Sequence, residues 1–137
     1  MSKTIRFIPI PLVLAAMLWA GAALAEDRFA ALSMIETGDN DFAHGRDSEI
    51  SRYQIRQAMW LQVTNAPLDQ ATNPAVALSV AQTIAARRCA DFAKTHGRAP
   101  TDFEFYVLWN APQEVDRPSR AVRERAGRFV NLVQKSD

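Results

Sequence analysis

The segment from Asn73 to Gly97 constrains the fold more than any other part of the chain. Asn73 is a favourable N-cap residue, Pro74 falls at the first helical position, and Gly97 can close a helix in the left-handed conformation. Between them, apolar residues form two stripes at helical spacing: Val76, Val80 and Ile84 in one, and Leu78, Ala81, Ala85, Cys89 and Phe92 in the other. Two stripes predict a long helix that is buried on more than one side.

The residues before this helix predict two shorter helices with a polar segment between them. Phe29, Leu32 and Ile35 provide the apolar face of the first helix, and Gly38 can terminate it. The segment that follows is rich in Gly, Asn, Asp and Ser, which is typical of turns. The predicted elements are, in order, a helix over residues 27–36, turns over residues 39–48, a short strand or hairpin arm over residues 49–53, and a helix over residues 54–63.

Two more helices are predicted after Gly97. Thr101 and Glu104 have the spacing of a capping box, which predicts a helix that begins there and ends near Asn110. The final helix has an apolar side formed by Val122, Ala126, Phe129, Val130 and Val133. Its arginines are expected to form a solvated face; they are Arg120, Arg123, Arg125 and Arg128. These patterns together predict a small, mainly α domain.

The first 25 residues have the composition of a secretory signal. Lys3 and Arg6 form a basic start, an apolar run follows, and the run ends in the small-x-small pattern of residues 23–25. We therefore expect an exported protein of the periplasm or cell envelope, with a single domain over residues 26–137. No stable membrane anchor is expected after cleavage of the signal.

Charge and cysteine content exclude some functions. Removal of Lys3 and Arg6 takes the net charge from +1 to −1, so no basic surplus indicates nucleic-acid binding. Cys89 is the only cysteine, which rules out an internal disulfide, and a lone thiol in an oxidising compartment is best buried. His44 and His96 lack other metal-ligating residues nearby in the sequence, so no metal site is expected.

Glu36 is the candidate catalytic residue. It lies at the end of the first predicted helix, at the edge of the apolar face. Partial burial and the negative end of the helix dipole both favour a protonated carboxyl group. A general acid for glycosidic cleavage needs a carboxyl group that stays protonated near neutral pH.

Residues 36–40 read E-T-G-D-N, residues 43–55 end in Gln54 and Ile55, and residues 108–112 read L-W-N-A-P. These motifs resemble the soluble lytic transglycosylase (SLT) family of the lysozyme-like superfamily. The family pattern E-S-G-x-N is similar to residues 36–40, which read E-T-G-D-N. The family arm that ends in G-L-M-Q-I aligns without a gap with residues 43–55, where Gln54 and Ile55 match. The family's A-Y-N-A-G-P is similar to residues 108–112, which read L-W-N-A-P.

The chain departs from the family pattern at several positions. Ser48 and Ser51 replace two glycines, and we expect a different backbone there, because glycine supplies positive φ angles or close approach. Trp109 replaces a tyrosine whose phenol, in the family, helps to orient the catalytic acid and the substrate. Indole can still stack on a sugar and donate one hydrogen bond. The glycine after Ala111 is missing.

The resemblance implies a small, mainly α, lysozyme-like domain with a short hairpin or irregular arm beside the catalytic helix. It implies that Glu36 protonates the oxygen between N-acetylmuramic acid and N-acetylglucosamine in peptidoglycan, and then accepts the proton of the muramoyl 6-hydroxyl as a 1,6-anhydro product forms. No cofactor is required. The residues expected to bind substrate are Asn40, Glu49, Ser51, Tyr53, Gln54, Trp109 and Asn110.

Two alternatives remain open. Glu49, Ser51 and Tyr53 would share one face of a strand, and a Glu49 that faces Glu36 could position a water, which would make the protein a hydrolytic muramidase. The departures from the family pattern favour a non-catalytic peptidoglycan-binding envelope protein, whereas the intact Glu36, Asn40 and Gln54 oppose it. In either case an envelope protein partner could target so small a domain.

Overall fold

The computed structural model describes residues 26–135, which form five α-helices and one small sheet. Residues 26–37 form the N-terminal helix. The hairpin strands are β1 (Glu49–Ile50) and β2 (Ile55–Arg56), and the other helices are α2 (Gln57–Val63), α3 (Pro74–His96), α4 (Asp102–Asn110) and α5 (Arg120–Lys135). Two short 3-10 helices, Leu68–Thr72 and Pro112–Glu114, precede α3 and follow α4. The predicted signal lies outside the described residues.

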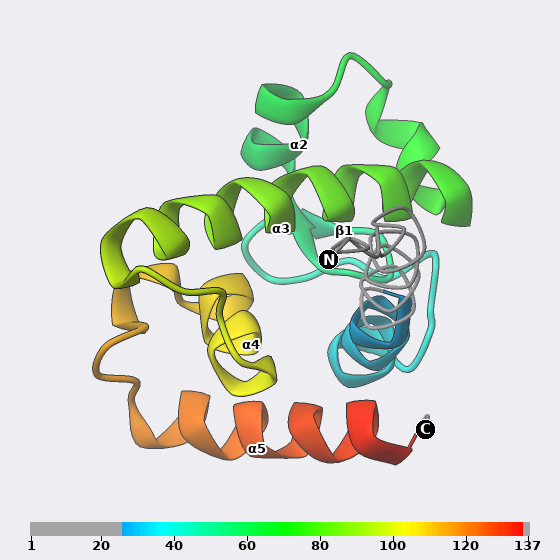
Figure 1. Ribbon diagram of the computed structural model, residues 1–137. Coiled ribbons are helices and arrows are strands. Elements are labelled where there is room, and N and C mark those ends of the chain that lie inside the picture. Colours follow the sequence, from blue (N-terminus) through cyan, green and yellow to red (C-terminus); the bar gives the residue numbers. More distant parts are fainter. Residues whose placement is uncertain (1–25, 136–137) are drawn as a thin grey trace, which may run out of the picture.

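The long helix α3 crosses the whole molecule (Figure 1). The helix α2 lies on one side of α3, and α4 and α5 lie on the other side, where the N-terminal helix is seen nearly end-on beside α4. The core contains large side chains from four helices, including Leu32, Trp60, Tyr106 and Phe129, all fully buried. Within residues 26–135, no helix is long and apolar enough to cross a membrane.

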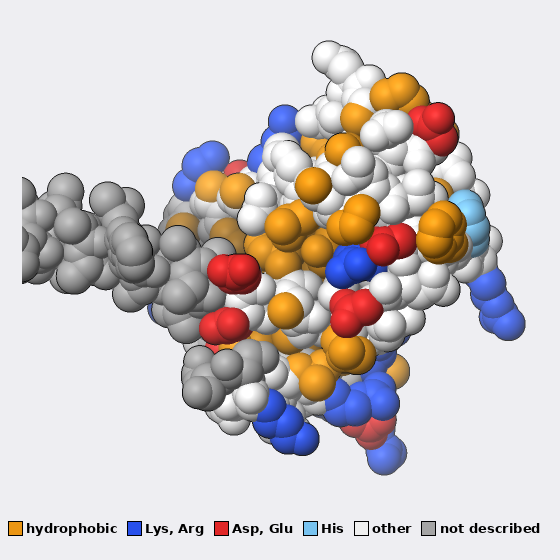
Figure 2. Space-filling view, turned by 90° about the vertical axis from the view of Figure 1, so that its right-hand side faces the viewer, with side chains coloured by type: hydrophobic (Ala, Val, Ile, Leu, Met, Phe, Trp, Pro, Cys, Tyr) orange, Lys and Arg blue, Asp and Glu red, His pale blue; other side chains and the backbone are white. Residues whose placement is uncertain are grey.

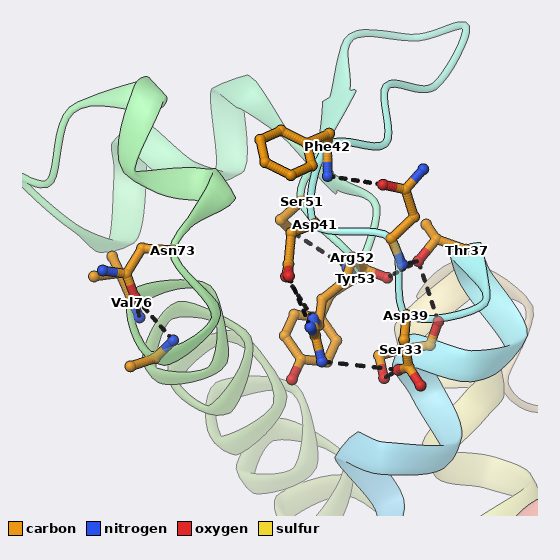
Figure 3. Close-up of polar contacts among 12 residues, drawn as sticks. Ser33, Thr37, Asp39, Asp41, Phe42, Ser51, Arg52, Tyr53, Asn73 and Val76 are labelled. Atoms are coloured by element: carbon orange, nitrogen blue, oxygen red, sulfur yellow. Dashed lines mark hydrogen bonds and ion pairs between the residues drawn. The ribbon is translucent and has the colours of Figure 1, made fainter.

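The predicted ends of α3 are confirmed. The side chain of Asn73 accepts hydrogen bonds from the backbone N–H groups of Ala75 and Val76 (Figure 3). Gly97 follows the helix with a φ of 69°. Both stripes contribute to the core: the buried residues of α3 are Ala77, Val80, Ala81, Ile84, Ala85 and Phe92. Cys89 is half-buried, and burial raises the pKa of its thiol.

The hairpin differs from its prediction. Glu49 pairs with Arg56 and Ile50 with Ile55, so the strands end where a tight turn over residues 51–54 begins. The second helix therefore begins at Gln57, because the preceding residues are used in β2. Residues 49–53 do not form one strand, so the predicted alternation of Glu49, Ser51 and Tyr53 on a single face is wrong.

The apolar side of α5 is confirmed by the burial of Val122, Ala126, Phe129 and Val133. The prediction that every arginine of this helix is solvated is wrong for Arg125, whose side chain is 38% exposed and approaches Glu36. On the face at the right of Figure 1, acidic, basic and apolar side chains are intermixed (Figure 2). The mainly α prediction is confirmed.

Candidate functional site

The N-terminal helix places Glu36 on the inner side of the molecule. Phe29 and Leu32, on the same helix, are buried in the core, and the ring of Phe29 meets those of Tyr53 and Phe105 edge to face. These contacts fix the rotation of the helix. As a result, the side chain of Glu36 is only 7% exposed.

Two side chains from distant elements contact the carboxylate. The phenol of Tyr106, on α4, donates a hydrogen bond to Oε1 of Glu36 at 2.8 Å. A guanidinium nitrogen of Arg125, on α5, lies 3.4 Å from the same oxygen. Both contacts involve Oε1, so the described hydrogen bonds leave Oε2 for another partner.

The environment raises the pKa of Glu36 above its ordinary value of 4.5. Burial is the main cause, because removal of water disfavours the charged form. The hydrogen bond from Tyr106 and the charge of Arg125 act in the opposite direction, and the charge of Glu49 raises the pKa further. The carboxyl group is thus partly protected from ionisation while it remains held by a donor.

The side chain of Glu36 lines a cavity of about 660 Å³. Five of the residues predicted for the site line it, from the N-terminal helix, β1, the hairpin turn and α4; they are Glu36, Glu49, Gln54, Trp109 and Asn110. A carboxyl group with a raised pKa in a cavity with polar and aromatic walls can act as a general acid. The fold therefore brings residues of the segment 36–55 next to residues of the segment 108–112, the two segments that carry the candidate site residues.

Gly45 allows Glu49 and Gln54 to lie beside each other at the cavity wall. A Cβ atom at Gly45 would collide with the carboxylate of Glu49 and lie 2.7 Å from Oε1 of Gln54. Glu49 accepts a hydrogen bond from the backbone N–H of Asp47, and Gln54 donates one to the carbonyl of Ser51. The two side chains are therefore oriented by the hairpin's own backbone.

Trp109 is held from two directions. Its indole N–H donates a hydrogen bond to the carbonyl of Tyr53 at 3.3 Å, so the donor that we expected to be free for substrate is already used. The guanidinium of Arg88 lies 5.7 Å from the ring centroid. Arg88 also donates to the carbonyls of Leu108 and Trp109, at 3.0 and 2.6 Å. What Trp109 offers the cavity is ring surface.

Three of the predicted substrate-binding residues do not line the cavity: Asn40, Ser51 and Tyr53. Asn40 is exposed, and its side chain accepts a hydrogen bond from the backbone of Phe42 (Figure 3). Ser51 is buried and accepts a hydrogen bond from the backbone of Tyr53, which packs in the core. Their observed contacts are structural ones.

A separate set of contacts fastens the hairpin to the end of the N-terminal helix. Thr37 donates a hydrogen bond to the carbonyl of Arg52 at 3.0 Å. The guanidinium of Arg52 binds both carboxylate oxygens of Asp41, at 2.6 and 2.9 Å, and lies 3.8 Å from Asp39 (Figure 3). Bidentate pairing of this kind fixes geometry as well as charge. The result is a fixed position of the hairpin relative to Glu36.

The backbone at the two serines has the conformation that glycine favours. Ser48 and Ser51 have φ angles of 61° and 68°. The expectation of a different backbone at these positions is therefore not met, because both serines occupy the left-handed region despite its steric cost.

Sequence reasoning did not place Tyr106 and Arg125 in the site. Tyr106 carried a usable signal, because a tyrosine on the inward face of a helix needs a hydrogen-bond partner for its hydroxyl. The sequence contains no comparable signal for Arg125, since it lies among other arginines on an amphipathic helix.

Within residues 26–135, no group of three metal-ligating side chains could hold a metal ion. Comparison with protein-family models, curated proteins and solved structures gave no match.

Proposed function

We propose that the protein is a lytic transglycosylase of the lysozyme-like type, which cleaves the β-1,4 bond between N-acetylmuramic acid and N-acetylglucosamine in peptidoglycan. The observation that carries this proposal is the environment of Glu36: a buried carboxyl group with a raised pKa, bound by a phenol, at the wall of an open cavity. The resemblance of residues 36–55 to the SLT family supplies the substrate. In this proposal the exported protein acts in the periplasm or cell envelope.

In this proposal the two carboxylate oxygens of Glu36 have different tasks. Tyr106 and Arg125 both engage Oε1. Oε2 then carries the proton that is transferred to the glycosidic oxygen as the bond to the muramoyl sugar breaks. Once ionised, Glu36 is stabilised by the phenol and the guanidinium, and it accepts the proton of the 6-hydroxyl that attacks the anomeric carbon. The product is a 1,6-anhydro sugar.

Tyr106 supplies the phenol that this chain lacks at position 109, where the family has a tyrosine. The family carries tyrosine where this chain has Trp109, and Tyr106 lies about one helical turn earlier on α4. Residues three apart on a helix share a face, so a phenol at either position can approach the same carboxyl group. Trp109 then provides ring surface for a sugar, with Gln54 and Asn110 as hydrogen-bonding groups in the same cavity.

A hydrolytic muramidase of the same fold is the second candidate. It is favoured by Glu49, which lines the same cavity and whose negative charge raises the pKa of Glu36. A second carboxylate of this kind can activate water on the opposite face of the sugar, at carboxyl separations of about 6.5–9.5 Å in inverting enzymes.

Digestion of purified peptidoglycan sacculi by the mature chain, with products identified by mass, tests these proposals. Anhydro-muropeptides from the wild type and none from Glu36→Gln are expected. Products heavier by one water, lost again in Glu49→Gln, would indicate the muramidase. Sacculi that are bound but left uncut by every variant would contradict an enzyme and leave a non-catalytic peptidoglycan-binding protein. Co-purification from envelope extracts tests the proposed envelope partner.

A further inference from the structure

The cavity beside Glu36 contains more positive charge than the proposed chemistry uses. Its charged lining consists of Glu36 and Glu49 with four arginines; they are Arg46, Arg56, Arg88 and Arg125. Arg125 is accounted for by its contact with Glu36. The other three arginines remain, and Glu49 is the one further acidic residue of the lining that could offset their charge.

Arg88 and Arg56 line the same cavity, and the hydrogen bonds of Arg88 supply it with no opposite charge. Arg88 is half-buried, and the hydrogen bonds described above join it to the uncharged carbonyls of Leu108 and Trp109. Burial and the nearby charge of Arg56 both lower the pKa of Arg88. Because both guanidinium groups line this cavity, an anion bound in it would offset the repulsion between their charges.

Arg56 and Arg46 are both available to a ligand. Arg56 lies 4.0 Å from Asp47, with side chains 70% and 72% exposed, and such a surface pair contributes little. Arg46 is exposed and makes no hydrogen bond or ion pair with another residue in the described part of the chain. Arg46 therefore adds a positive charge to the cavity lining that no acidic side chain within residues 26–135 offsets by an ion pair.

We propose that Arg46, Arg56 and Arg88 form an arginine subsite that binds a carboxylate carried by the sugar next to the bond that is cut. This inference rests on the proposed function and names its specificity: glycans with carboxylate substituents are preferred over uncharged N-acetylglucosamine polymers. Guanidinium groups suit this task because they bind carboxylates in a planar, two-point geometry. The carboxylate could belong to the lactyl ether of muramic acid or to an attached peptide, and the test separates these sources.

The test measures binding by calorimetry to the full mature chain carrying Glu36→Gln, so that ligands are not cut. Three tetrasaccharides are compared: chitotetraose, the N-acetylglucosamine–N-acetylmuramic acid tetrasaccharide with free lactyl carboxylates, and the same sugar with its lactyl groups joined to stem peptides. At least one carboxylated ligand is expected to bind about tenfold more tightly than chitotetraose, with an advantage that shrinks as salt is added. The ligand that shows the advantage identifies the source of the carboxylate.

Arg56→Gln is expected to remove most of this advantage and to leave the affinity for chitotetraose unchanged. The matched control is Arg87→Gln, since Arg87 is exposed on α3 next to Arg88 but does not line the cavity. Equal affinity for all three ligands would overturn the arginine subsite and leave the proposed function standing. Absence of binding by all three would overturn both. An equal loss in Arg56→Gln and Arg87→Gln would also overturn the subsite.

Discussion

The pair formed by Glu36 and Tyr106 joins the end of the N-terminal helix to the middle of α4. The phenol donates a hydrogen bond to a carboxyl group that is itself removed from water. Each group therefore provides a hydrogen-bond partner for the other where little water can reach them. The same burial, together with the charge of Glu36, raises the pKa of Tyr106 far above its ordinary range. Tyr106 therefore remains a hydrogen-bond donor at neutral pH and well above it.

Tyr106→Phe is expected to raise the pKa of Glu36 further, because the lost hydrogen bond is one that favours the ionised form. Glycan cleavage should slow about tenfold, since the carboxyl group loses the contact that orients it. Carboxyl titration by NMR and the pH dependence of kcat measure the two effects. Tyr53→Phe is the matched control, as Tyr53 is the other tyrosine of the chain and lies outside the cavity. An unchanged titration of Glu36 in Tyr106→Phe would contradict this role.

Ser48→Gly is expected to stabilise the protein by about 0.5–1 kcal/mol. Ser48 is exposed and has a positive φ, a conformation that costs other L-residues about 1–2 kcal/mol and glycine almost nothing. Part of the gain is offset by the greater freedom of glycine in the unfolded chain. Urea unfolding measures the change. Ser48→Ala retains the Cβ atom and should give no gain, so equal stabilisation by both variants would disprove the explanation.

At the scale of elements, α4 depends on local contacts at its start. The side chain of Thr101 accepts a hydrogen bond from the backbone of Glu104, and Glu104 accepts one from the backbone of Thr101. Arg98 binds both carboxylate oxygens of Glu104, and this contact is the main cause that lowers the pKa of Glu104 to about 2. Because α4 carries Tyr106 and Trp109, its cap also supports the site.

Thr101→Ala is expected to destabilise the protein by about 1 kcal/mol, because the backbone N–H of Glu104, in the first turn of α4, loses the hydroxyl oxygen that accepts its hydrogen bond. Thermal or urea unfolding measures the loss. The matched control is Thr83→Ala, which removes a hydroxyl bonded to the carbonyl of Ser79 inside α3 and should change stability by a few tenths of a kcal/mol at most. Equal losses in the two variants would refute the capping explanation.

At the scale of the whole molecule, the buried carboxyl group makes stability depend on pH. The pKa of Glu36 is higher in the folded than in the unfolded chain, so the folded chain holds this proton more tightly. The contribution of Glu36 to stability is therefore fully present below its ordinary pKa of 4.5 and is lost as the pH rises through the folded value. Tyr106 and Arg125 offset part of the free-energy cost of ionising the buried carboxyl group, because both favour its charged form.

Glu36→Gln should accordingly become more stable relative to the wild type as the pH increases from about 4.5, because the amide cannot ionise. Urea unfolding of both proteins at a series of pH values measures this difference. A difference in the free energy of unfolding that stays constant across the series would show that burial does not shift the titration of Glu36.

The sequence by itself determined the features that depend on residues a few positions apart. The N-cap at Asn73, the left-handed Gly97 and the capping box at Thr101 were readable because each is a contact within one helical turn. The apolar spacing of α3 and α5 predicted which sides are buried, and the position of Glu36 beside such a face predicted its partial burial. In each case the physical cause lies in the local chain.

Only the tertiary structure decided which side chains meet Glu36. Tyr106 and Arg125 lie 70 and 89 residues away in sequence, and they reach the carboxyl group because α4 and α5 pack against the same core as the N-terminal helix. The pairing of β1 with β2 likewise turned Ser51 and Tyr53 into the core and left Glu49 and Gln54 at the cavity. Residues 51–54 form a tight turn that the pairing of β1 with β2 closes. Backbone pairing between residues apart in sequence, and not the alternation of a single strand, therefore selected which of these side chains line the cavity.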